Sequence, residues 1–120
     1  MKKILIVALA FMSLPSISSV ADKTPEYART TSCMAFERLI YDFGGDDEGL
    51  DYIAYLLKLA ESEYKKMHPD LDNEHIGFNI GFDVGQLYGS LISIKKNNQL
   101  SNNEAKDVFL QLAKKSECYE

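Results

Sequence analysis

Residues 76–94 read IGFNIGFDVGQLYGSLISI, and the fold depends on whether this stretch forms a strand or a helix. Apolar residues alternate with other residues from Ile76 to Val84, as in a β-strand, but the alternation then stops. At helical spacing, an apolar stripe and a narrow polar stripe both continue to the end of the stretch. The apolar stripe is Ile76, Ile80, Val84, Leu87, Leu91 and Ile94, and the polar one is Asn79, Asp83, Gln86, Ser90 and Ser93. We therefore predict a helix from about Asn73 to Lys96.

This predicted helix also carries glycines spaced by four residues, at Gly77, Gly81, Gly85 and Gly89. Four interior glycines cost roughly 3–4 kcal/mol of helix propensity relative to alanine. We expect close approach of another helix backbone to offset this cost. Aromatic residues such as Phe78 and Phe82 fill the remaining faces, so we predict that this is the central, mostly buried helix of the fold.

Three further helices are predicted from capping residues and apolar periodicity. Their expected bounds are Pro25 to about Tyr41, Asp46 or Asp47 to His68, and Ser101 to about Lys115. Thr24 can cap the first of them, and Ser101 with Glu104 forms a capping box for the last. The predicted fold is therefore all-α: a compact four-helix domain with a central glycine-striped helix.

The N-terminus has the pattern of a secretory signal peptide. Lys2 and Lys3 precede an apolar run that is too short to anchor in a bilayer, and Ala21 ends a small-residue cleavage site. We expect residues 1–21 to be removed, leaving an exported domain of residues 22–120 in the periplasm, with no membrane association. The mature chain would keep 11 basic and 18 acidic residues, a net charge of −7. This charge argues against nucleic acid as a partner and is compatible with a basic protein.

The chain has two cysteines, Cys33 and Cys118. In an oxidising compartment one disulfide between them is the economical expectation. It would close a loop of about 86 residues. The spacing is not that of a Cys-x-x-Cys redox pair, so we interpret the bond as a structural staple.

No catalytic constellation or cofactor motif is recognisable, so we expect neither enzymatic activity nor a cofactor. Two loops are acidic, one with Asp46, Asp47 and Glu48 and the other with Asp70, Asp72 and Glu74. Neither has the spacing of a calcium-binding EF-hand loop. His68 and His75 lie on either side of a proline turn, and whether they bind zinc is left open. The acidic residues are our candidates for contact with a protein partner.

Three pieces of the chain are similar to small periplasmic immunity proteins of type VI secretion amidase effectors. These pieces are residues 31–35 (TSCMA), residues 77–85 (GFNIGFDVG) and the closing Cys118. Some members of this family have a central helix that opens with Gly-Tyr-x-x-Gly, and Phe78 stands at the aromatic position here. The resemblance implies a catalytically inert domain, often a dimer, that plugs the active-site cleft of a peptidoglycan amidase. Acidic loops would speed its encounter with a basic effector.

Two other functions are compatible with the residues. A periplasmic acid-activated chaperone would also be small, helical and stapled by one disulfide, and it would expose apolar surface when its 18 carboxylates are protonated. An envelope protein with a structural role would share the export signal and the fold. Loss of tertiary structure near pH 2–3 together with suppression of aggregation would distinguish the chaperone. The presence of an adjacent effector gene would distinguish the immunity protein.

Overall fold

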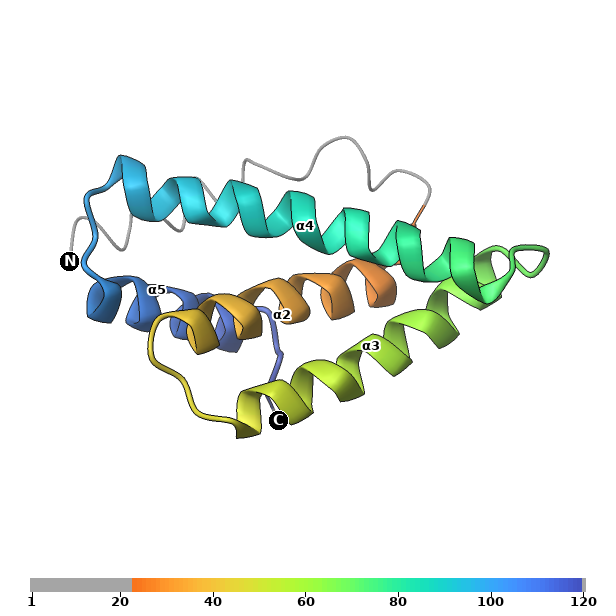
Figure 1. The fold of residues 1–120 in the computed structure, drawn as a ribbon, viewed down its shortest axis with the longest axis horizontal. Coiled ribbons are helices and arrows are strands. Elements are labelled where there is room, and N and C mark those ends of the chain that lie inside the picture. The colour runs from red at the N-terminus through yellow and green to blue at the C-terminus, as the bar shows by residue number, and fades with distance from the viewer. Residues whose placement is uncertain (1–22, 120) are drawn as a thin grey trace.

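The computed structural model describes residues 23–119, and these residues form four helices joined by short turns (Figure 1). The helices are α2 (Pro25–Asp42), α3 (Glu48–Met67), α4 (Asn73–Asn97) and α5 (Asn102–Lys115). The all-α prediction is confirmed, and the stretch that begins at Ile76 is helical throughout. The signal peptide predicted for residues 1–21 lies outside the described residues.

Local capping explains where three of the helices begin. The Thr24 hydroxyl accepts the Tyr27 N–H, and Pro25 occupies the first turn of α2, where its missing N–H costs nothing. The predicted capping box of α5 is present, with Ser101 and Glu104 bonded reciprocally. Asp72 caps α4 by accepting the His75 N–H. The helix bounds that were predicted from sequence therefore agree with the structure to within a few residues.

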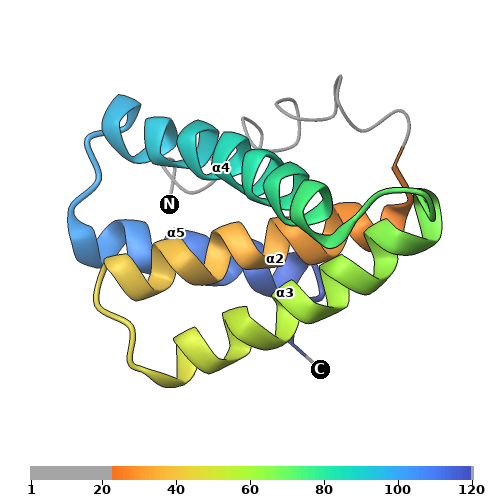
Figure 2. The same cartoon turned by 45° about the vertical axis from the view of Figure 1, so that its right-hand side comes forward.

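The central helix is α2, which corrects the prediction that the glycine-striped helix occupies this place. In both views α2 lies between the other three helices, and it packs against α3, α4 and α5 (Figures 1 and 2). Its side chains Tyr27, Ala35, Phe36 and Leu39 are fully buried. Helix α4 buries only the stripe formed by Ile76, Ile80, Leu91 and Ile94. It is therefore a side helix that packs against α2 along one face.

The glycines of α4 do not pack against another helix within residues 23–119, so the expectation of close backbone contact is wrong for this part of the chain. For Gly77, Gly81, Gly85 and Gly89, a Cβ atom added in ideal geometry has no other heavy atom within 4 Å beyond its chain neighbours and its own helix backbone. The neighbouring Phe78 and Phe82 side chains are 72% and 56% exposed. A helix that is apolar on most faces usually lies in a core, but here the face with the glycines, Phe78 and Phe82 is exposed.

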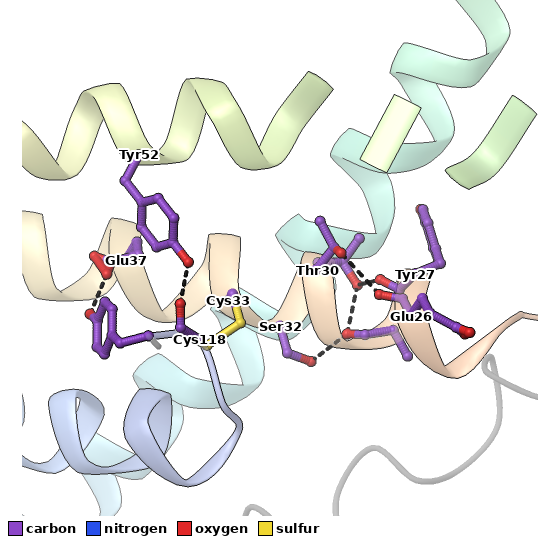
Figure 3. Close-up of a disulfide and its surroundings, with 11 residues drawn as sticks. Glu26, Tyr27, Thr30, Ser32, Cys33, Glu37, Tyr52 and Cys118 are labelled. Carbon is purple, nitrogen blue, oxygen red and sulfur yellow. Dashed lines mark hydrogen bonds between the residues drawn. A yellow bond between two sulfur atoms is a disulfide. The ribbon is translucent and has the colours of Figure 1, made fainter. Parts of the chain in front are cut away.

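The predicted disulfide is present between Cys33 and Cys118 (Figure 3). It joins the middle of α2 to the segment that follows α5, and both cysteines are buried. The bond therefore fastens the C-terminal segment to the central helix.

Candidate functional site

The turn between α3 and α4 forms an acidic corner, which we define as residues 68–75, at one end of the molecule (Figure 1). Asp70, Asp72 and Glu74 are all exposed there. The Asp72 carboxylate accepts the His75 N–H at 2.8 Å and lies 2.7 Å from His75 Nδ1. The bond from the His75 backbone lowers the pKa of Asp72, because it stabilises the ionised form. The corner therefore presents negative charge on a well-defined backbone.

A second hydrogen bond fixes the acidic corner from the side of α3. Lys65 Nζ donates to the Leu71 carbonyl oxygen at 2.6 Å, and the Leu71 N–H donates to the His68 carbonyl oxygen at 3.2 Å. Pro69 adds a fixed φ angle within the same turn. These hydrogen bonds and Pro69 therefore restrict the backbone of the acidic corner in the unbound protein.

The other predicted acidic set lies in the turn between α2 and α3, where Asp46, Asp47 and Glu48 are exposed. Helix α3 separates the two acidic sets, and its 20 residues at the α-helical rise span about 30 Å. The structure therefore does not bring the predicted contact residues together. They form two separate acidic patches at opposite ends of α3.

The two histidines have local partners rather than a shared site. The His75 ring is paired with Asp72, and the His68 ring lies 5.0 Å from the Tyr64 ring. Within residues 23–119 there is no group of three or more histidine, cysteine or acidic side chains placed to hold a metal ion.

An open cleft of about 1180 Å³ lies between α2, α3, α5 and the C-terminal segment. Inside it Glu37 is only 5% exposed, and the Tyr119 hydroxyl donates a hydrogen bond to its carboxylate. The Tyr52 hydroxyl donates to the Cys118 carbonyl oxygen, next to the disulfide (Figure 3). These two bonds and the disulfide together hold the last described residues against α2 and α3.

Glu37 is a buried ionisable group of the cleft. Burial raises the pKa of its carboxyl group and nearby Asp46 raises it further, whereas the bond from Tyr119 acts in the opposite direction. Sequence analysis missed this residue. Its burial could have been predicted from its position, because Glu37 lies one helical turn after Cys33 and next to the buried Phe36. Because Glu37 is already bonded to Tyr119, we assign the pair a structural role.

A partly buried polar cluster attaches α4 to α2, and the sequence analysis did not predict it. The Tyr27 hydroxyl donates to Asp83 Oδ2 at 2.7 Å, and Lys23 Nζ pairs with Asp83 Oδ1 at 2.8 Å. Burial, followed by the bond to Asp83, raises the pKa of Tyr27 well above its usual range. The predicted polar stripe of α4 thus contributes a partly buried ion pair near the start of α2 and is not entirely solvated.

Helix α4 also has an exposed face that carries glycine and phenylalanine and no charged residue. We define the glycine face as the exposed positions Gly77, Phe78, Gly81, Phe82, Gly85 and Gly89. Beside it runs an apolar groove of about 610 Å³, with Met34 of α2, Leu57 of α3 and Ile80 of α4 among its lining residues. Exposed apolar surface of this kind on a small protein is typical of an interaction site.

Comparison with protein-family models, with curated proteins and with solved structures finds no match to this chain. No helix in residues 23–119 has the length and hydrophobicity needed to cross a membrane. The functional proposal therefore depends on the chain's own residues and geometry, together with the resemblance noted from its sequence.

Proposed function

We propose that this chain is an exported, non-catalytic protein that binds and blocks a cell-wall-degrading amidase effector in the periplasm. The observation that supports this proposal is the acidic corner, residues 68–75. It stands at one end of the molecule and combines exposed carboxylates with a backbone fixed by hydrogen bonds. An inhibitor that inserts a loop into an enzyme cleft needs this combination.

The physical advantage of such a corner is that little order has to be gained on binding. Fixing a flexible loop in a complex costs about 0.5–1.5 kcal/mol for each immobilised side chain. The bonds from Lys65 to Leu71 and between Asp72 and His75 already restrict the backbone. Less free energy is therefore lost in ordering the corner when it binds its partner.

The charge of the corner sets the kind of partner. Asp70 and Glu74 are exposed and make no ion pair with another described residue, so both are available to a basic surface. Exposed charges act mainly by steering the encounter, and this effect weakens as salt screens them. We expect the effector to carry a basic rim around its cleft. The α2–α3 patch, Asp46, Asp47 and Glu48, is the second candidate contact.

The cellular experiment compares cells that carry or lack this gene while the effector encoded beside it is delivered to the periplasm. We expect lysis only in cells that lack the gene. Equal survival of both strains would contradict the proposal.

The binding experiment uses Asp70→Lys, with Asp107→Lys as the matched control, because Asp107 is exposed on α5, which lies outside the acidic corner. We expect Asp70→Lys to slow association with the effector about tenfold at low salt, with a smaller defect at high salt. Asp107→Lys should change the rate much less. An equal effect of both variants would mean that net charge, and not the corner, controls binding.

A further inference from the structure

The cleft between α3 and α5 is long and large for a protein of this size. Both helices pack against α2, but they make little contact with each other. Its lining residues on α2 extend from Arg29 to Tyr41, which is a distance of about 18 Å at the α-helical rise. Its volume of about 1180 Å³ exceeds the range of about 300–1,000 Å³ that is usual for small-molecule sites. An elongated ligand made of several units therefore fits the cleft better than a single compact one.

Three tyrosine rings in the cleft form a continuous series, which we call the tyrosine row: Tyr55, Tyr52 and Tyr119. The centroid of the Tyr52 ring lies 6.1 Å from that of Tyr55 and 6.1 Å from that of Tyr119. The Tyr52 ring plane differs by 11° from that of Tyr55 and by 30° from that of Tyr119. Tyr55 is 60% exposed and Tyr119 is 37% exposed. The row therefore leaves aromatic surface accessible to a ligand that consists of linked rings.

Hydrogen bonds hold two of these three rings in place in the unbound protein. The Tyr52 hydroxyl donates to the Cys118 carbonyl oxygen, and the Tyr119 hydroxyl donates to Glu37 Oε1. The disulfide with Cys33 fixes Cys118 in turn. A tyrosine side chain supplies a large contact area at a low cost in conformational entropy, and a ring that is already fixed loses less on binding. The tyrosine row is therefore preorganised for a ligand.

The charges in the cleft are nearly balanced, although the predicted mature chain has a net charge of −7. The lining includes three basic side chains, Arg29, Lys106 and Lys114, and four acidic ones. Such a balance favours an uncharged ligand over a strongly acidic or basic one. The buried carboxylate of Glu37 also has an acceptor to spare, because its Oε2 atom has no hydrogen-bond partner within residues 23–119. The cleft thus offers hydrogen-bond donors and acceptors around an aromatic surface.

We propose that this cleft binds a neutral oligosaccharide, whose sugar rings stack on the tyrosine row. The face of a pyranose ring presents C–H groups, and these pack against the electron-rich face of an aromatic ring. The hydroxyl groups at the edge of the sugar ring both donate and accept hydrogen bonds. Arg29 and Lys114 can donate to them, and Glu37 Oε2 can accept from them. None of these contacts uses a residue of the acidic corner or of the α2–α3 patch.

The first test is a titration of the mature chain, purified with its disulfide formed, with chitotetraose and with cellotetraose. Tyrosine fluorescence reports binding directly, because the chain has no tryptophan and four of its seven tyrosines line the cleft. We expect a saturable change with at least one of these neutral oligosaccharides, with a Kd of about 0.1–1 mM. Two-dimensional NMR should place the largest chemical-shift changes at the tyrosine row.

The second test removes one ring of the row. Tyr55→Ala should weaken oligosaccharide binding about five- to tenfold, because one stacking surface is lost. Tyr55→Phe keeps the ring and should retain most of the affinity. The matched control is Phe78→Ala, which removes a ring that is 72% exposed on α4, outside the cleft, and should bind as the wild type does. Circular dichroism should show all three variants folded, since both side chains are mostly exposed.

Three results would overturn the proposal. The first is no saturable response to either oligosaccharide up to about 10 mM, and the second is equal binding by Tyr55→Ala and Phe78→Ala. The third is a short peptide of mixed charge that binds in the cleft more tightly than both oligosaccharides, which would assign the cleft to peptides. Oligosaccharide binding is independent of the proposed function, because it is measured without the effector. Tyr55→Ala should still protect cells, and Asp70→Lys should still bind the oligosaccharide.

Discussion

Replacing Gly81 by alanine should stabilise the folded monomer, although glycines in a packed helix contact usually cannot be replaced. Gly81 lies in the interior of the 25-residue helix α4, and a Cβ atom there has no neighbour within 4 Å. The change in the free energy of unfolding should then equal the difference in helix propensity, which favours alanine by about 0.8–1 kcal/mol. For a domain of this size, that gain corresponds to an increase in Tm of about 4–8 °C.

The assay is urea or thermal unfolding at a concentration low enough for the chain to be monomeric. Gly45→Ala is the informative comparison, because its Cβ would lie 3.0 Å from the Ile40 carbonyl oxygen and from Tyr41 Cα. We expect Gly45→Ala to destabilise the chain by about 1–3 kcal/mol, since backbone atoms must move to accommodate it. A loss of stability in Gly81→Ala at low concentration would refute the description of α4 as an open side helix.

Three further predictions concern the bonds that hold the fold together. Replacing Cys33 and Cys118 by alanine should cost about 3–5 kcal/mol in urea unfolding, because a bond between residues 85 positions apart no longer restricts the unfolded chain; a loss below about 1 kcal/mol would contradict this. Burial raises the pKa of the Glu37 carboxyl group above its ordinary 4.5, so the folded chain binds a proton at Glu37 more tightly than the unfolded chain does. The free energy of unfolding therefore falls as the pH rises from 4.5 through the pKa of Glu37 in the folded chain. The stability of Glu37→Gln relative to wild type should therefore increase between about pH 4 and pH 7, and a constant difference would exclude this linkage. Tyr27→Phe should cost about 1–2 kcal/mol in thermal unfolding through the lost bond to Asp83, and an unchanged Tm would show that this bond contributes no net stability.

The ends of the helices and the cysteine pair depend on local sequence or on composition. The capping residues Thr24 and Ser101 and the helical spacing after Ile76 were sufficient to predict the helices. The disulfide followed from there being only two cysteines in a chain expected to be exported. Each of these inferences depends on neighbours in sequence or on a count, so no knowledge of packing was required.

The candidate site was predictable only in part. The exposed acids of both turns could be identified from sequence, since charged residues beside helix ends are normally solvated. Their separation could not, because it depends on the length and direction of α3 in the folded chain. Glu37 was missed because a single acid beside apolar residues normally stays exposed, whereas Tyr119 supplies a partner 82 residues away.

By itself, the sequence determined the helical class, the helix ends and the cysteine pair, all of which follow from local backbone preferences or from simple counting. Only the tertiary structure decided which helix is central. Apolar burial is non-directional, so the apolar faces of α2 and α4 are equally suited to a core when each is considered alone. The disulfide at Cys33 and the contacts of α2 with all three other helices place it in the middle. This leaves the glycine face of α4 outside, available to another molecule.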